Sequence, residues 1–238
     1  MQCCQLSKSF GNVVVADSIA FSVDIGEAVG IIGPNGAGKT SLFNLITGTL
    51  QPDSGQIQFK QRDITRDNSA KRCKGGIARS FQIPQPFSGM SVYENVLVAA
   101  THGAELPASK AQAISLDALQ QTGMMHRANA VAGSLTLLER KRLELTRALA
   151  SNPSLLLLDE IAGGLTEAEC HSLIETIQSI HQSGVTIIWI EHVVHALLAV
   201  VDRLIVLDFG KVIADGDPKT VIASKEVQEN YLGLAPDA

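Results

Sequence analysis

The stretch GPNGAGKT (residues 33–40) constrains the fold more than any other part of this sequence. It follows AVGIIG (28–33), a short apolar run typical of a buried strand. It precedes SLFNLITG (41–48), where apolar spacing and a final glycine indicate a helix. A strand, a glycine-rich loop ending in Lys-Thr and a helix form the context that the P-loop motif requires. We therefore expect an α/β fold with a P-loop NTPase core of the RecA-like kind.

This loop has the groups needed to hold the phosphates of ATP. Glycines let the backbone curl so that successive N–H groups point inward, and the helix that follows adds the positive end of its dipole. We expect Lys39 to reach the β and γ phosphates, Thr40 to bind Mg²⁺ and Ser41 to reach the α phosphate. The rest of the expected cradle is Gly33, Pro34, Asn35, Gly36, Ala37 and Gly38. The alternative is a glycine-rich turn without a ligand.

Two carboxylates follow the apolar run in LLLLDE (155–160). Four leucines predict a buried strand, so both acids lie at its carboxyl end, where open α/β sheets bind ligands. We expect Asp159 to take part in the Mg²⁺ shell, and Glu160 to polarise a water for attack on the γ phosphate. A strand that simply ends in solvated acids is the alternative.

Apolar strands alternating with helices predict a mostly parallel sheet that is covered on both faces. Before it, alternating apolar and polar residues (13–25) predict an N-terminal antiparallel β-subdomain. Helical signals without a strand predict an inserted α-helical subdomain at 84–150. One domain would then span 1–238, with 1–83 and 151–238 forming the nucleotide-binding core and the β-subdomain. Expected helix starts are the capping boxes at Ser91, Thr136 and Thr166, and the N-cap Asp217.

Composition narrows the classes of partner. The net charge is −5, which argues against nucleic acid, because proteins that bind phosphate backbones usually carry a basic excess. We interpret the basic cluster Lys71, Arg72 and Lys74 as a solvated surface, and the four cysteines as reduced thiols. The richest apolar stretch (193–207) is interrupted by charged residues, so we expect any membrane role to come through a partner.

Together these motifs resemble the ATP-binding subunit of ABC transporters, over essentially the whole chain. The resemblance implies that Phe10, in SKSFG, stacks on adenine, although core packing is the local alternative. It implies that Gln82, in ARSFQ, belongs to the Q-loop and senses Mg²⁺ and the γ phosphate, where the alternative is a polar loop residue. His192, after the strand VTIIWI, would be the switch histidine that bonds the γ phosphate and Glu160, where the alternative is a structural histidine.

The signature of that family reads like LSGGQ and contacts the ATP held by a second subunit. At the matching place this chain reads LTLLE (135–139), where Thr136 keeps the hydroxyl, Leu138 replaces glycine and Glu139 replaces glutamine. Thr136 and Glu139 also form a capping box, so a plain helix start is the local alternative. The departures lead us to favour a heterodimer with another ATPase subunit over a homodimer.

ARSFQ, MSVYENVLVAATH, RKRLELTRALA and the ending NYLG (230–233) resemble the subgroup that serves branched-chain amino acid importers, the LivG-like subgroup. The resemblance implies an ATPase on the cytoplasmic face of the inner membrane, docked on permease subunits through the segment after Gln82. Such a subunit makes no direct contact with the solute. The solute could equally be a related small amide or organic acid.

Two other classes compete with a transport ATPase. A soluble ABC-type ATPase without a transporter usually carries two cassettes or a long coiled-coil insertion, whereas this chain has one cassette. A P-loop small-molecule kinase would need an arginine-rich lid, and Gln82 and His192 would then be coincidences.

The signature residues generate a first prediction. Replacing Leu138 by Gly together with Glu139 by Gln is expected to raise the ATP hydrolysis rate of the isolated subunit, because backbone can then approach the triphosphate and a negative charge is removed. Steady-state phosphate release measures it. An unchanged rate would mean that the stretch is already competent, or that another step limits activity.

Overall fold

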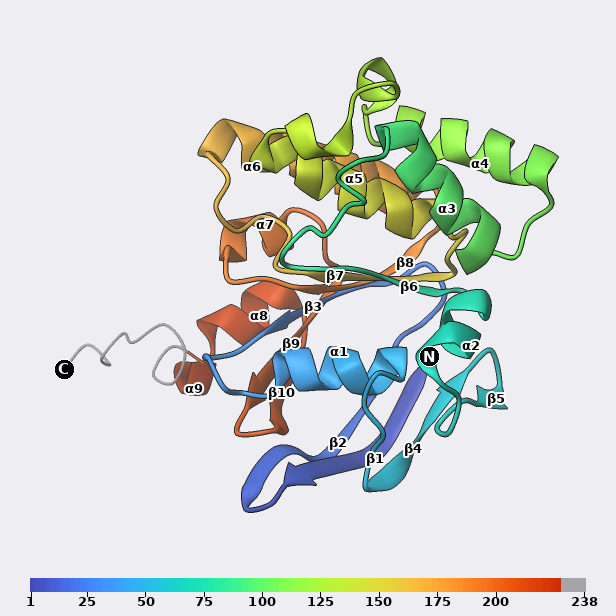
Figure 1. The fold of residues 1–238 in the computed structure, drawn as a ribbon. Coiled ribbons are helices and arrows are strands. Elements are labelled where there is room, and N and C mark those ends of the chain that lie inside the picture. The colour runs from blue at the N-terminus through green and yellow to red at the C-terminus, as the bar shows by residue number, and fades with distance from the viewer. Residues whose placement is uncertain (228–238) are drawn as a thin grey trace.

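The apolar runs pair into one six-stranded sheet in the computed structural model, which describes residues 1–227 (Figure 1). Its order is β10-β9-β3-β8-β7-β6, and every neighbouring pair is parallel except β10 with β9. The expected fold class is confirmed, whereas the NYLG stretch lies outside the described residues. The strands are β3 (Ala28–Ile32), β6 (Ile77–Ser80), β7 (Leu155–Asp159), β8 (Thr186–Ile190), β9 (Arg203–Asp208) and β10 (Lys211–Gly216).

Sequence patterns did not predict β6 and β10, because neither carries a long apolar run. The N-terminal strands form a separate four-stranded antiparallel sheet, as expected, in the order β2-β1-β4-β5. In Figure 1 this second sheet lies below the main one. Its strands are β1 (Gln2–Phe10), β2 (Val13–Ser22), β4 (Ser54–Phe59) and β5 (Arg62–Asp63).

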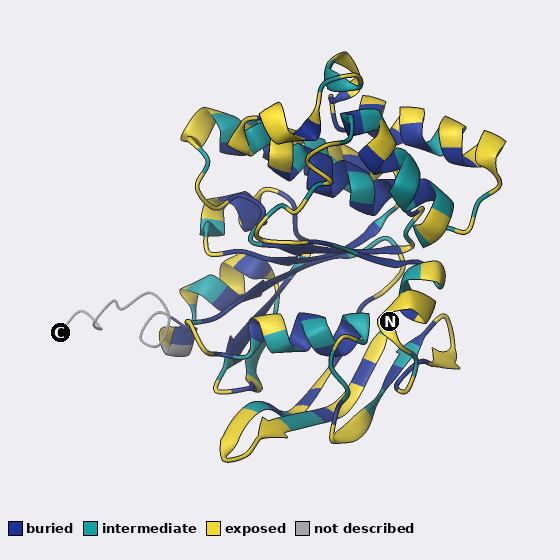
Figure 2. Ribbon diagram, in the orientation of Figure 1, coloured by how far each residue is buried: buried dark blue, intermediate teal, exposed yellow. Residues whose placement is uncertain are grey.

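The two faces of the main sheet bury two hydrophobic clusters. Alternate side chains of a strand point to opposite faces, so Leu156 and Trp189 belong to one cluster and Leu157 and Ile188 to the other. The first cluster includes residues of α3 to α7, above the sheet in Figure 1, and the second includes α1 and the antiparallel sheet below it. Figure 2 shows the sheet as a buried layer between them.

The helices begin close to their expected caps. Capping boxes are present at Ser91, Thr136 and Thr166, and the Asp217 side chain accepts from the backbone N–H of Thr220, so these predictions are confirmed. The boundaries of the helical subdomain, 84–150, stay a prediction. The helices are α1 (Lys39–Thr47), α2 (Ser69–Lys74), α3 (Val92–Gly103), α4 (Ala108–Gln121), α5 (Leu137–Ala150), α6 (Glu167–Gln182), α7 (Val194–Leu198), α8 (Pro218–Ala223) and α9 (Lys225–Val227), with 3₁₀ turns at Met125–Arg127 and Ala132–Ser134.

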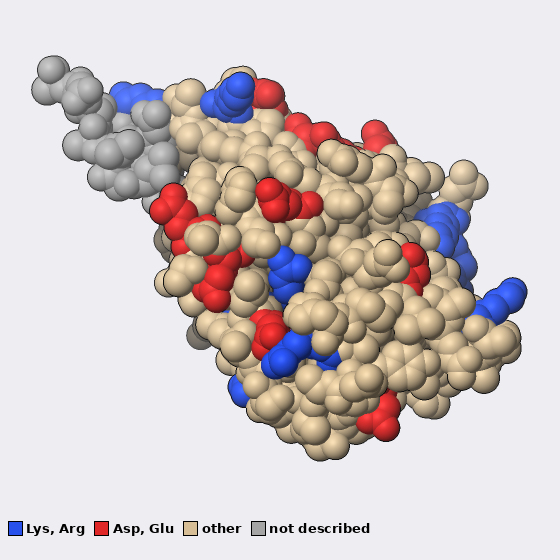
Figure 3. All heavy atoms as spheres, turned by 90° about the horizontal axis from the view of Figure 1, so that it is seen from above, with Lys and Arg blue, Asp and Glu red and all other residues tan. Residues whose placement is uncertain are grey.

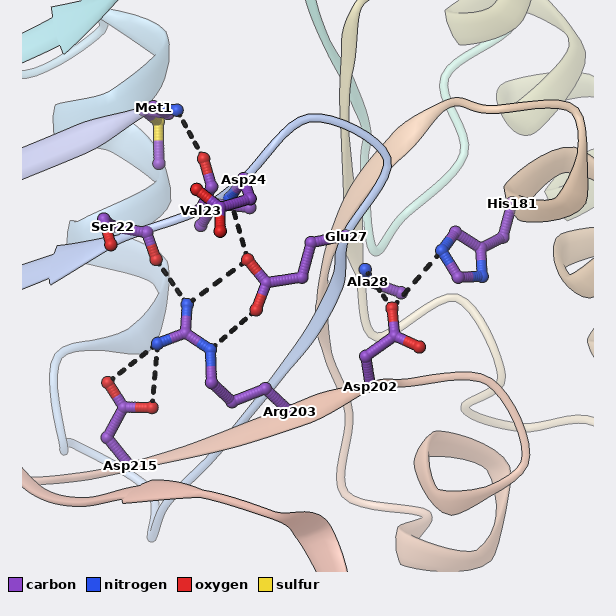
Figure 4. Close-up of polar contacts among 10 residues, drawn as sticks. All are labelled: Met1, Ser22, Val23, Asp24, Glu27, Ala28, His181, Asp202, Arg203 and Asp215. Carbon is purple, nitrogen blue, oxygen red and sulfur yellow. Dashed lines mark hydrogen bonds and ion pairs between the residues drawn. The ribbon is translucent and has the colours of Figure 1, made fainter.

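Arg203, at the start of β9, joins the two sheets (Figure 4). Its Nε donates to Glu27 Oε1 at 2.7 Å, and its Nη1 donates to both carboxylate oxygens of Asp215 on β10 at 3.0 and 3.1 Å. Its Nη2 donates to the carbonyl oxygen of Ser22, the last residue of β2. One guanidinium group therefore ties β9, β10 and the end of β2 together.

Arg72 corrects the interpretation of the basic cluster as a solvated surface. Its side chain is only 1% exposed. Nη1 donates to the carbonyl oxygens of Leu45 and Ile46, at 2.5 and 2.9 Å, and Nη2 donates to that of Thr65 at 2.9 Å. The last carbonyl groups of a helix have no partner within it, so Arg72 completes the end of α1. Sequence periodicity could not show this, because α2 is only six residues long.

Replacing Arg72 by Met is therefore expected to lower the free energy of unfolding by about 3 kcal/mol, since buried carbonyl groups lose their donors. Its matched control is Lys71→Met, one residue earlier on α2, where the side chain is 68% exposed and its Nζ lies 3.7 Å from Asp67 Oδ1. That change should cost less than about 0.5 kcal/mol. Urea unfolding measures both, and equal losses would contradict the role of Arg72.

Candidate active site

The P-loop connects β3 to α1 in a conformation that two of its glycines make possible. Gly33 and Gly38 have φ angles of +157° and +100°. A Cβ atom would lie 2.2 Å from the carbonyl oxygen of Leu207 at the first position, and 2.3 Å from that of Val15 at the second. Neither position accepts a side chain, because the loop is pressed against β9 and β2.

Lys39 is the first residue of α1 and is buried. Its Nζ donates to the carbonyl oxygens of Gly33 and Pro34, at 2.7 and 2.9 Å, so the ammonium group lies inside the curl of the loop. Burial lowers the pKa of Lys39, and the carboxylates of Glu160 and Asp159 act in the opposite direction. The helix begins two residues earlier than its apolar pattern indicated.

The other P-loop residues offer groups at the surface. Asn35, Gly36 and Thr40 are exposed, Ser41 is half-buried in the first turn of α1, and Ala37 is buried. The first N–H groups of a helix have no acceptor within it, so this end of α1 presents donors to an anion. The loop and the helix start thus fit a chain of phosphate groups.

Three of the expected site residues meet at one carboxylate. Gln82 Nε2 donates to Glu160 Oε2 at 2.5 Å, and His192 Nε2 lies 2.8 Å from Glu160 Oε1. They follow β6, β7 and β8, which are parallel neighbours, so their carboxyl ends share one edge of the sheet. Glu160 lies 78 positions after Gln82 in the sequence, and His192 lies 110 positions after it. Only the pairing of their strands brings the three residues together.

Glu160 itself has an uncommon backbone conformation, with φ at +46°. A residue with a Cβ atom pays about 1 to 3 kcal/mol for the left-handed region, and such residues concentrate at functional sites. Its N–H donates to the carbonyl oxygen of Ile190 at 2.9 Å, which ties the residue to the end of β8. The backbone therefore turns sharply at the carboxylate that Gln82 and His192 contact.

Asp159 has a partner that sequence analysis missed. Arg79 on β6 donates from Nη2 to Asp159 Oδ2 at 2.5 Å and from Nη1 to Asn44 Oδ1 on α1 at 2.7 Å. Both charged side chains are almost fully buried. A charged residue within the short stretch IARS (77–80) was the available signal for this pair.

The oxygen donors expected to hold Mg²⁺ fit that ion chemically. Thr40 supplies a hydroxyl, Gln82 an amide and Asp159 a carboxylate, and Mg²⁺ is bound in proteins through oxygen atoms. Thr40 is exposed in the first turn of α1. Asp159 is the last residue of β7, at the edge of the sheet where β3 also ends. Nothing in this donor set favours a softer metal.

The signature stretch forms the N-terminus of α5. Thr136 Oγ1 accepts from the N–H of Glu139, and a Glu139 carboxylate oxygen accepts from the N–H of Thr136 at 2.9 Å. Burial raises the pKa of Glu139, but this bond and the charge of Arg127, whose Nε lies 2.8 Å from Oε1, bring it below its usual value. Its negative charge is therefore compensated within the subunit, and Leu138 is half-buried.

Phe10 lies at the end of β1 with 54% of its surface exposed, which excludes the alternative of core packing. The Lys8 Nζ stands 5.5 Å from the centre of the ring. A second exposed aromatic residue, Phe209, lies in the β9–β10 turn beside the P-loop, since the N–H of Gly210 donates to the carbonyl oxygen of Ala37. Sequence analysis did not single it out.

Comparison with known proteins agrees with this geometry. Residues 16–163 match the family described as ABC transporter. The chain is 33% identical to the probable branched-chain amino acid transport ATP-binding protein LivG of Methanocaldococcus jannaschii, over 95% of this chain and 94% of that protein. It is 31% identical to the lipopolysaccharide export system ATP-binding protein LptB of Escherichia coli, over 96% and 95%.

A solved structure is similar over the same extent. The ADP conformation of MJ1267, an ATP-binding cassette of an ABC transporter, superposes with a TM-score of 0.89 at 31% identity, covering 98% of each chain. The fold, the family match and the relatives all indicate the same family. The chain belongs to the ABC transporter family, as an ATP-binding subunit with ATPase activity.

Proposed function

We propose that this subunit drives a membrane importer for branched-chain amino acids, or for related small amides or organic acids, by hydrolysing ATP at the edge where β3, β6, β7 and β8 end. The observation that carries the proposal is the meeting of Gln82, Glu160 and His192 beside the P-loop. The similarity to the LivG protein supports the choice of solute.

Binding of ATP would use the P-loop as a cradle. Its N–H groups and Lys39 face the phosphates, with Lys39 exchanging its two carbonyl acceptors for the β and γ oxygens. Ser41 serves the α phosphate, and Phe10 offers an exposed ring to adenine. Thr40, Gln82 and Asp159 would hold Mg²⁺, which supplies positive charge against the phosphate oxygens.

Hydrolysis would use Glu160 as the general base. Its carboxylate takes a proton from water as the water oxygen bonds to the γ phosphorus, and the bond from that phosphorus to the oxygen of ADP breaks. Gln82 and His192 hold the carboxylate by its two oxygens, which fixes its direction. The His192 side chain is 39% exposed beside Glu160, so its ring is open to a phosphate oxygen that comes to this edge.

A second ATPase subunit would complete each site. The P-loop leads into α1 on one face of the sheet, whereas the signature opens α5 on the other face (Figure 1). The two anion-binding helix ends of one copy therefore lie on opposite sides of the sheet, and a second copy would supply its signature to the phosphates held here. A heterodimer is favoured over a homodimer, because Leu138 and Glu139 stand where the family has glycine and glutamine.

A groove between β6, α3 and α5 suits a cytoplasmic segment of a permease subunit. It encloses about 330 Å³ and is lined in part by Phe81, Ala99, Glu144 and Arg147. Phe81 directly precedes Gln82, so a segment seated there would touch the loop that contacts Glu160. Seen from above in Figure 3, charged side chains on the helical face are scattered between wide uncharged areas.

Such docking would put the subunit on the cytoplasmic face of the inner membrane, without contact to the solute and without nucleic acid as a partner. Within residues 1–227 no helix is long and apolar enough to cross a membrane. The alternative, a soluble ABC-type ATPase without a transporter, would leave the groove free. Co-purification of the tagged chain with membrane permease subunits from its own cells distinguishes the two.

Two substitutions test the site. Lys39→Ala is expected to weaken ATP binding by at least about tenfold, because the phosphates lose their buried cation. Glu160→Gln is expected to slow hydrolysis by at least about a hundredfold while ATP remains bound, because the general base is lost. Equilibrium binding of a fluorescent ATP analogue and phosphate release measure the two effects. Unchanged hydrolysis in both variants would contradict the site assignment.

The association state supplies a separate test. Glu160→Gln protein with Mg-ATP is expected to stay monomeric by light scattering if a different ATPase subunit is its partner, and to form a dimer once that subunit is added. A clean shift to dimer with Mg-ATP alone would overturn the preference for a heterodimer. It would also show that the stretch 135–139 acts as a signature in trans.

A further inference from the structure

Two charged side chains without a role in the site so far are buried next to the loop that follows Glu160. Lys141 on α5 is 4% exposed, and Glu191, directly after β8, is 1% exposed. Lys and Glu are almost never fully buried unless specific contacts compensate their charge. Neither residue touches the P-loop cradle described above, so nucleotide binding does not account for them.

The contacts of both side chains converge on one short stretch of backbone. Lys141 Nζ donates to the carbonyl oxygen of Glu160 at 3.3 Å. Glu191 Oε1 accepts from the N–H of Ala162 at 2.6 Å, and Oε2 accepts from the N–H of His192 at 3.2 Å. The loop is therefore held at its start by a cation and two residues later by an anion.

These bonds act where the backbone is under strain. Glu160 has its φ at +46°, and a loop free to relax would leave this region and turn the carboxylate away from Gln82 and His192. Glu191 also holds the N–H of His192. One buried carboxylate thus fixes the backbone on both sides of the 2.8 Å contact between His192 and Glu160.

The two charges also support each other. Burial raises the pKa of Glu191, whereas its backbone hydrogen bonds and the charge of Lys141 lower it. Burial lowers the pKa of Lys141, and the charges of Glu191 and Glu160 oppose that effect. The neighbouring Cys170 thiol on α6 has its pKa raised, by burial first and then by Glu191. Backbone hydrogen bonds are thus the main compensation for the buried charge of Glu191, whose pKa stays raised overall, and the charge of Lys141 adds a smaller one.

We propose that Lys141 and Glu191 are positioning residues for hydrolysis, which together hold residues 160–162 so that the Glu160 carboxylate faces its substrate water. The inference rests on the proposed role of Glu160 as general base. Lys141 lies just over one turn after Thr136, at the start of the same helix. A movement of the signature helix against a second subunit would therefore reach the Glu160 backbone through one hydrogen bond.

The decisive variant is Lys141→Met in the full chain, which keeps the length of the side chain and removes the donor. Its expected effect is a fall of at least about tenfold in the single-turnover rate of ATP hydrolysis, with the Kd for ATP within about twofold of the parent. A loss of ATP affinity in proportion to the rate would overturn the proposal, because it would indicate general damage to the fold.

Arg142→Met is the matched control on the next residue of α5. Arg142 also donates to backbone carbonyl oxygens, those of Thr122 and Ser172 at 2.6 and 3.1 Å, but it braces α5 against α4 and α6. It should lower the melting temperature and leave the single-turnover rate within about twofold. An equal fall in rate for Arg142→Met would reduce the effect of Lys141 to helix packing and overturn the proposal.

A double-mutant cycle with Glu160→Gln separates positioning from an independent role. If Lys141 acts through Glu160, adding Lys141→Met to Glu160→Gln should change the residual rate by less than about twofold. The same tenfold loss in both backgrounds would overturn the proposal. If Glu160→Gln alone leaves hydrolysis unchanged, the general-base assignment and this inference fail together. If Glu160→Gln slows hydrolysis but Lys141→Met hydrolyses ATP at the parent rate, only the positioning role of Lys141 is overturned.

Two conservative changes keep the test decisive if Lys141→Met does not fold. Lys141→Arg retains a cationic donor and should recover at least about half of the parent rate. Glu191→Gln retains one acceptor oxygen but loses the charge that faces Lys141, and should slow hydrolysis by at least about threefold at unchanged Kd. Parent rates for Glu191→Gln would overturn the proposal.

Discussion

The parallel pairing of β3, β8, β7 and β6 is the constraint on which the rest of this protein depends. Each strand is short and largely buried, and residues that the apolar core does not need lie at or just after its end, at the same edge. The P-loop, Gln82, Glu160 and His192 leave the sheet at that edge. Because the strand order differs from the chain order, neighbours in the site come from distant parts of the chain.

Burial of charge is the second feature that shapes the site. Lys39 is held by carbonyl oxygens of its own loop, and Asp159 is held by Arg79. Such charges are costly in the interior unless hydrogen bonds surround them. Phosphate oxygens can replace these carbonyl oxygens as acceptors for the Lys39 ammonium group.

The two faces of the sheet carry different parts of the molecule. The face that packs on α1 carries the phosphate cradle, and the face that packs on α3 to α6 carries the signature helix and borders the groove beside Phe81. Lys141 links the second face to the catalytic edge by its bond to the backbone of Glu160. This bond gives a route through packed elements from the signature helix to the Glu160 carboxylate.

The sequence by itself determined the fold class, the P-loop, the carboxylates at the end of LLLLDE and most helix starts, because these depend on local rules: apolar periodicity, glycine conformations and side-chain caps. It missed β6 and β10, whose runs are short and mixed, and it placed Arg72 in solvent. Only the tertiary structure decided the partners of Arg72, Arg79, Lys141 and Glu191. Their bonds join residues up to 80 positions apart. A charged residue within an apolar pattern indicates a buried charge that needs a partner. Which residue becomes that partner depends on which strands and helices lie side by side.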